Sequence, residues 1–277
     1  MAVKPDVSLL LSHVAHIIRP DPAANETCWQ ANDTLYTASR PMKKIITLGL
    51  VTLVAGLLHA ADSGTKDKIT AATKKVGDQA NYSWTTSTKE ADGSPGRLGP
   101  LDGKAEKGGV TFLSFTIGGL PVEVCMKGSK GAAKALEGWQ TFEDIAATGG
   151  TAEAVVKYLR TYQGPVAEAT GLAGKLTDLK EADGALVGDL KEDALKELLL
   201  FGTRQREGQV PPKIEGAKGS VKFSIKDGAL TKYEIKIQGK VTAGERVMEI
   251  NRTTTTEIKE VGSTKIELPD EAKQKLN

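Results

Sequence analysis

Only a few residues of this chain have the types and spacing of a nucleophilic catalytic site. Ser63 and Lys66 form S-x-x-K, the spacing of a serine–lysine acyl-transfer pair. Enzymes of that kind also carry S-D-N and K-T-G motifs, and neither motif occurs in this sequence. We therefore interpret the spacing as a coincidence.

Adjacent acidic residues and one glycine-containing segment are the other candidates. Glu143 with Asp144, and Glu192 with Asp193, are neighbours in sequence, and neighbours on a helix point in different directions. We expect these carboxylates to be solvated or to cap helices. The segment GPLDGKA, residues 99–105, is one residue too short between its glycines for a phosphate loop, and Ala105 stands where Ser or Thr should bind the metal. The sequence thus predicts no catalytic residue, no metal site and no cofactor.

Residues 40–63, RPMKKIITLGLVTLVAGLLHAADS, have the pattern of a bacterial secretory signal. Two lysines follow Met42, and an apolar run of about 14 residues leads to the small Ala60 and Ala61. This run is shorter than the roughly 18 to 20 residues that cross a bilayer as a helix, which argues against a permanent membrane anchor. We predict a signal peptide over residues 42–61, cleaved near Ala60 or Ala61, and a location in the periplasm or outside the cell.

The signal divides the chain into parts. Residues 1–41 are interpreted as an upstream extension from a misassigned start codon, or as a pre-region that is removed with the signal. The predicted mature chain, residues 62–277, contains no histidine and keeps Cys125 alone. It can therefore form neither a Ser-His-Asp or Cys-His site nor an internal disulfide. No cysteine directly follows the apolar run, so no lipid anchor is expected.

Charge and composition narrow the class of protein further. The first 61 residues hold five of the 37 basic and four of the 35 acidic residues, which leaves a net charge near +1 on the remainder. Nucleic-acid binding would require a basic patch, so no nucleic-acid partner is expected. Few aromatic residues and 30 glycines favour an α+β domain with many turns over a helical bundle.

Hydrophobic periodicity predicts mainly strands, with a few helices between them. The clearest signal is SVKFSIKDGALTKYEIKIQGKV, in which apolar and polar residues alternate on both sides of Asp227-Gly228, as in an antiparallel hairpin. Residues 171–190 are expected to be loop with at most one short strand. The other expected strands are NYSWTTSTKEA, two in residues 110–128 joined near Gly118 and Gly119, residues 247–259 and residues 263–269; the expected helices are residues 65–76, 151–162, 189–201 and 270–276.

This order of elements, with its closing segment TTTTEIKEVGSTKIELPDEAKQKL, resembles the superfamily of periplasmic lipoprotein carriers (LolA-type) and their lipid-carrying relatives. The resemblance implies a single α+β domain over residues 62–277, built on a curved, largely antiparallel β-sheet that forms an unclosed barrel. In that superfamily helices cover the concave face and an acyl chain is held between helices and sheet. The implied function is non-catalytic binding of a lipid or other apolar ligand in the cell envelope.

Two questions stay open at this point. Apolar strand residues line either a ligand cavity or a filled core: Leu113, Phe115, Phe223, Ile225, Tyr233, Ile235 and Ile237. If the core is filled, the alternative is an envelope protein-interaction or sensor domain on the same fold, with a protein as its partner.

Overall fold

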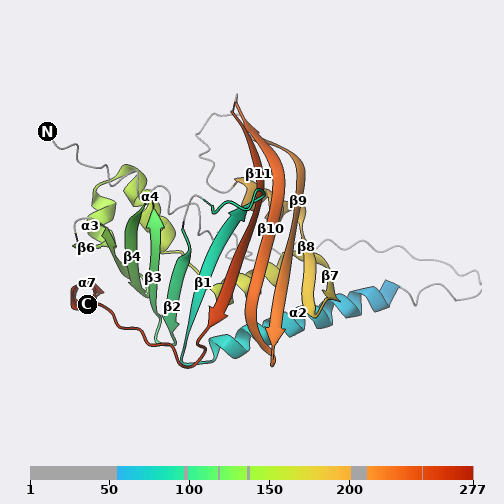
Figure 1. The fold of residues 1–277 in the computed structure, drawn as a ribbon, viewed down its shortest axis with the longest axis horizontal. Helices are drawn as coiled ribbons and strands as arrows, with labels where there is room; N and C mark the ends of the chain where they lie inside the picture. The colour runs from blue at the N-terminus through green and yellow to red at the C-terminus, as the bar shows by residue number, and fades with distance from the viewer. Residues whose placement is uncertain are drawn as a thin grey trace, which may run out of the picture.

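A single open antiparallel sheet organises the chain (Figure 1). The computed structural model describes residues 55–96, 99–117, 119–135, 138–200, 211–244 and 246–276. The sheet has 11 strands in the order β6-β5-β4-β3-β2-β1-β11-β10-β9-β8-β7. Because β6 and β7 lie at opposite edges, the sheet is not closed into a barrel. This confirms the α+β fold class predicted from the sequence.

The strands are β1 Asn81–Glu90, β2 Leu101–Glu106, β3 Val110–Ile117, β4 Leu120–Lys127, β5 Lys130–Ala135, β6 Gly138–Thr141, β7 Leu176–Ala182, β8 Ala185–Leu190, β9 Lys213–Lys226, β10 Ala229–Ala243 and β11 Arg246–Lys259. The helices are α2 Ala55–Gly77, α3 Phe142–Ala147, α4 Gly150–Leu159, α5 Pro165–Gly174, α6 Glu192–Leu200 and α7 Asp270–Leu276.

One long-range pairing joins the two halves of the sheet. Every other pair of neighbouring strands is consecutive in sequence, whereas β1 pairs with β11 and sets Trp84 opposite Ile258 and Thr86 opposite Thr256. Along these strands alternate residues face the same side. The β1–β11 pairing therefore places the threonines of the last strand at the middle of the sheet.

Helices α2 to α6 lie on one side of the sheet, which we call the inner face. Ile69, Ala72 and Val76 of α2 are fully buried against it, and α6 packs on β9 and β10. A Cβ atom at Gly219 would lie 2.8 Å from the Cδ1 atoms of both Leu190 and Leu195. This strand position must therefore be glycine for α6 to approach so closely.

The C-terminal helix α7 covers the outer face of β4–β6 instead (Figure 1). Val124 belongs to the inner core, and its neighbour Cys125 belongs to a second, smaller cluster with Ala132, Trp139, Ala272 and Leu276. Because successive side chains of a strand point to opposite faces, β4 contributes residues to the cores on both faces of the sheet. Cys125 is fully buried, and burial raises the pKa of its thiol to about 11.

Several sequence predictions are confirmed. Strands β1, β3, β4, β9, β10 and β11 and helix α7 lie where the patterns placed them. Asp227 and Gly228 both have positive φ, of 52° and 73°, as the two-residue hairpin turn requires. Helix α6 lies within the predicted residues 189–201. Helix α4 lies within the predicted residues 151–162, except that it begins one residue earlier, at Gly150.

Other predictions were wrong. Residues 171–190, expected to be mainly loop, contain the end of α5 and both strands β7 and β8. Residues 263–269 form no strand, and residues 101–106, not recognised as structured, form β2. Helix α2 begins at Ala55 rather than near residue 65. Residues 1–41 and the first part of the predicted signal, residues 42–54, lie outside the described residues.

Candidate ligand-binding site

The apolar residues predicted from the sequence all belong to, or pack on, one core cluster. Leu113, Phe115, Phe223, Tyr233, Ile235 and Ile237 are buried, with 0 to 7% of their surface exposed, and Ile225 is half-buried. Their surroundings differ along the sheet. Phe223 and Ile225 line a pocket, whereas Leu113 and Phe115 pack in the half of the inner face where α3 and α4 also contribute buried side chains.

The pocket at Phe223 and Ile225 lies between α2 and the strands β8 and β9, and we call it the α2–β9 pocket. Its volume is about 330 Å³. Ala71 contributes from α2, and Ala185 and Leu186 contribute from β8. Apolar atoms therefore dominate its wall, and the wall includes both the helix and the inner face of the sheet.

An ion pair lies at the rim of the α2–β9 pocket. Lys68 Nζ of α2 is 3.2 Å from Glu181 Oε2 of β7, and both side chains are well exposed. An exposed pair of this kind contributes at most about 1 kcal/mol to stability. It places two charged side chains at the edge of an apolar pocket.

A second pocket, of about 320 Å³, lies at the C-terminal end of α2, and we call it the α5 pocket. Its wall combines the end of α2 and the segment that follows it, the strands β1–β3 with the turn after β2, and the start of α5: Gly77, Gln79, Tyr82, Ala105, Glu106, Lys107, Thr111, Gly164, Val166 and Ala167. Tyr82 stacks at a tilt on Trp84 with ring centroids 5.6 Å apart. Burial raises the pKa of the Tyr82 hydroxyl to about 12, so it stays protonated at neutral pH.

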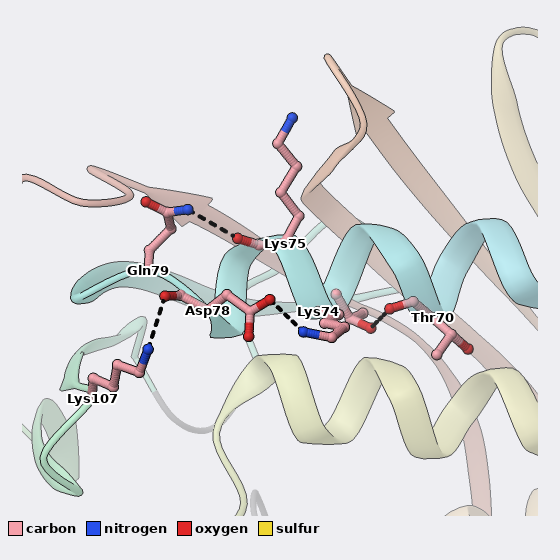
Figure 2. A network of polar contacts seen from close by, with 7 residues as sticks. Thr70, Lys74, Lys75, Asp78, Gln79 and Lys107 are labelled. Carbon is pink, nitrogen blue, oxygen red and sulfur yellow. Dashed lines mark hydrogen bonds and ion pairs between the residues drawn. The ribbon is translucent and has the colours of Figure 1, made fainter.

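Polar contacts hold the end of α2 beside the α5 pocket (Figure 2). Lys74 Nζ donates to Asp78 Oδ2, and Lys107 Nζ donates to the backbone oxygen of Asp78 at 3.4 Å. The hydrogen bond and charge of Lys74 lower the pKa of the Asp78 carboxyl. Lys74 and Lys75 also lie in the last turn of α2, where the helix dipole favours cations.

Polar side chains of β1, β10, β11 and α5, together with Tyr162, form a group that we call the Glu168 cluster: Thr86, Tyr162, Glu168, Tyr233 and Thr256. The Tyr233 hydroxyl donates to Glu168 Oε2, and the hydroxyls of Thr86 and Thr256 are 2.9 Å apart. Thr256 also hydrogen-bonds Tyr233. Burial raises the pKa of both tyrosines and of the Glu168 carboxyl.

A half-buried arginine lies further along the same face of β11. Arg252 is on the same side of the strand as Thr254 and Thr256, and its Nη2 atom is 3.5 Å from the backbone oxygen of Leu198 in α6. Desolvation lowers the pKa of its guanidinium, and Glu90 opposes that shift. Arg252 thus links the sheet to α6 across the inner face.

The sequence analysis did not identify the Glu168 cluster or Arg252. One signal was available in RTTTTEI, because alternate residues of a strand share a face and Arg252, Thr254 and Thr256 are two apart. Glu168 had no such signal, since its partner Tyr233 is 65 residues away in sequence.

Comparisons with known proteins give likenesses of structure. A scan against models of protein families matches none, and a search of curated proteins gives no match. Among solved structures the chain is similar to lipoprotein LppX of Mycobacterium tuberculosis, with 12% identity, a TM-score of 0.41 and coverage of 74% of this chain and 100% of that one. LprF from Mycobacterium bovis has 9% identity, a TM-score of 0.39 and coverage of 76% and 98%.

A LolA superfamily protein from Nitrosomonas europaea is also similar, with 10% identity, a TM-score of 0.28 and coverage of 76% of this chain and 96% of that one.

Two further findings concern the described residues. None of their helices is long and apolar enough to cross a membrane. They also contain no group of three or more His, Cys, Asp or Glu side chains placed to hold a metal ion.

Proposed function

We propose that this chain is an exported, non-catalytic protein that binds a lipid or another apolar ligand in the bacterial cell envelope. The observation that carries the proposal is the α2–β9 pocket, in which Phe223 and Ile225 of the inner face meet Leu186 and Ala71 around about 330 Å³. That volume is at the lower end of the roughly 300–1,000 Å³ of small-molecule sites. It suits one acyl chain rather than a whole phospholipid.

The sequence supports the two other parts of the proposal, that the protein is exported and that it is not a catalyst. The basic, apolar and small-residue regions of residues 42–61 follow the order of a secretory signal. After its removal no histidine remains, and Cys125, the single thiol, is buried under α7. We propose that the mature chain starts near residue 61 or 62 and works in the periplasm or outside the cell.

Ligand binding is tested with fatty acids and alkyl alcohols of increasing chain length, measured by titration calorimetry. Each buried methylene contributes about 0.8 kcal/mol. Two more carbons should therefore strengthen binding about tenfold until the pocket is full. Affinity that does not change with chain length would contradict an apolar pocket as the site.

Filling each pocket locates the site. Ala71 and Ala167 line the α2–β9 and α5 pockets respectively, and both are exposed. Ala71→Trp and Ala167→Trp should each leave the fold intact, and the one that occupies the binding pocket should weaken acyl-chain binding at least tenfold. Ala147→Trp, at an exposed position of α3 outside both pockets, is the matched control. If neither pocket variant weakens binding, the proposal fails.

The alternative is an envelope protein-interaction or sensor domain whose core is filled. It is favoured by the burial of Leu113 and Phe115 together with residues of α3 and α4, since that half of the core is packed. Under this alternative the chain binds no acyl probe, and all three tryptophan variants behave alike.

A further inference from the structure

Two lysine side chains lie at one edge of the α2–β9 pocket. Lys68 and Ala71 line the pocket from α2, and Lys75 follows one turn after Ala71 on the same face of that helix. The Nζ atom of Lys75 donates to the backbone oxygen of Asp227 at 2.6 Å. The next residue of that turn, Gly228, also lines the pocket. The helix side of the pocket therefore carries two ammonium groups.

These two ammonium groups have different partners. Lys68 Nζ is paired with Glu181 Oε2 at 3.2 Å. Lys75 Nζ donates to a neutral carbonyl oxygen and forms no ion pair with any residue that the structure describes. Figure 2 shows the Lys75 side chain pointing away from Lys74 and Asp78. The positive charge of Lys75 is thus not neutralised by a carboxylate, and Lys68, Lys75 and Glu181 together carry one net positive charge.

The floor of the same pocket is apolar and buried. Phe223, Leu186 and Ala185 have 0 to 5% of their surface exposed. At the edge, by contrast, the side chains of Lys68 and Glu181 are 62% and 64% exposed. An apolar interior with a few charged groups at its mouth orients a ligand that has one apolar and one charged end. The pocket therefore has the polarity of an amphiphile.

From this arrangement we infer that the α2–β9 pocket binds a fatty carboxylate, with the alkyl chain on the apolar floor and the head group between Lys68 and Lys75. The inference rests on the proposed function, since it names the polar end of the same ligand. The ligand carboxylate replaces Glu181 as the partner of Lys68 at little cost, because exposed ion pairs contribute little to stability. One negative charge balances the net charge of this edge, whereas a cationic head group is repelled by both lysines.

The first test compares three ligands of one chain length, decanoate, decanol and decylamine, at pH 8 and low ionic strength and below their micellar concentrations. Titration calorimetry on the full chain should show decanoate binding at least about fivefold more tightly than decylamine, with decanol between them. Sodium chloride at about 0.5 M should reduce this difference to about twofold or less, because salt screens exposed charges.

Variants of the Lys68–Glu181 pair should have opposite effects on decanoate binding. Lys68→Gln and Lys75→Gln each remove a positive charge and should weaken it about threefold, whereas Glu181→Gln frees Lys68 for the ligand and should strengthen it about threefold. If the pair had a purely structural role, Lys68→Gln and Glu181→Gln would change binding in the same direction. Lys273→Gln and Glu271→Gln, equal changes of net charge on the exposed surface of α7, are the controls and should leave decanoate binding unchanged.

The outcomes separate this inference from the proposed function. Equal binding of decylamine and decanoate, or unchanged or weaker decanoate binding in Glu181→Gln, would overturn the inference while leaving acyl-chain binding established. Loss of decanoate binding in Ala167→Trp but not in Ala71→Trp would do the same, since the ligand would then lie in the α5 pocket. Failure of all three ligands to bind would overturn both.

Discussion

At the scale of single residues, the middle of the sheet depends on close packing around one tryptophan. Trp84 of β1 is 2% exposed, and its indole lies directly over Gly103 of β2. A Cβ atom at Gly103 would come within 2.1 Å of Trp84 Cε2. The ring can occupy this place only because the facing strand position has no side chain.

Gly103→Ala should therefore displace Trp84 and lower the free energy of unfolding by about 1–3 kcal/mol, the usual cost of overpacking a core. Urea denaturation followed by tryptophan fluorescence measures the change. Gly108→Ala, at a turn position with no neighbour within 4 Å, is the control and should change stability by less than about 0.5 kcal/mol. An equal effect of the two substitutions would show that contact with Trp84 is unimportant.

Glu168 makes stability depend on pH in a direction that follows from its surroundings. Burial raises the pKa of its carboxyl in the folded state above the ordinary 4.5. The contribution of Glu168 to the free energy of unfolding is fully present below pH 4.5. It is lost as pH rises through the folded-state pKa, because the unfolded chain releases the proton more easily. The neighbouring hydroxyls of Tyr162 and Tyr233 stay protonated throughout, since their pKa values are raised too.

Glu168→Gln should remove this loss, so that the variant gains melting temperature relative to the natural protein between pH 4 and pH 8. Thermal denaturation at several pH values measures the difference, with Glu271→Gln as the control. A constant difference between Glu168→Gln and the natural protein over this range would contradict the raised pKa.

At the scale of elements, α7 acts as a cover for the outer face of β4–β6. Leu276 and Ala272 close the cluster around Cys125 and Trp139. Trp139 Nε1 is buried without a hydrogen-bond partner among the described residues, which costs about 1–3 kcal/mol of stability. The cover is therefore expected to detach more easily than the helices of the inner face.

Leu276→Asp should detach α7 by placing a carboxylate in this apolar cluster. In a Cys28→Ser background the reaction of Cys125 with an aromatic disulfide reagent should become at least tenfold faster, because the thiol loses its cover. Lys273→Ala, at an exposed position of α7, is the control. A thiol that stays unreactive in Leu276→Asp would mean that the sheet alone protects it.

At the scale of the whole molecule, the predicted mature chain should be a complete folding unit. Among residues 64–77 of α2, whose side chains the structure describes, the first that is buried in the core is Ile69, followed by Ala72 and Val76. Cleavage near Ala60 or Ala61 shortens α2 and leaves all three in place. The helix that spans the predicted cleavage point is thus compatible with removal of the signal.

A chain that starts at Asp62 should have a free energy of unfolding within about 1 kcal/mol of the full chain, as measured by urea denaturation. A chain that starts at Lys74 loses Ile69 and Ala72 and should be less stable by about 3 kcal/mol or more. Equal stability of the Asp62 and Lys74 chains would contradict the role of α2 in the core. Mass spectrometry of the exported protein would show whether its N-terminus lies at residue 61 or 62.

Strong local signals in the sequence are enough to define several of the elements. Alternation in β3, β9, β10 and β11 predicts strands because only a period of two puts one face against a core. Asp227-Gly228 predicts the hairpin because both residues tolerate positive φ. The sequence does not predict β5 and β6, and it predicts at most one short strand where β7 and β8 lie, because alanines, glycines and lysines in β5 and β7 give weak alternation and packing decides their conformation.

Where these elements meet depends on tertiary contacts that no local pattern predicts. The pairing of β1 with β11 joins residues about 170 apart, such as Thr86 with Thr256, and nothing local encodes it. The same holds for Glu168 and Tyr233, which come from α5 and β10. Whether an apolar strand residue lines a pocket, like Ile225, or fills a core, like Leu113, depends on which helix lies over it. Local patterns determine conformation, but a site is made by contacts between segments that are distant in sequence.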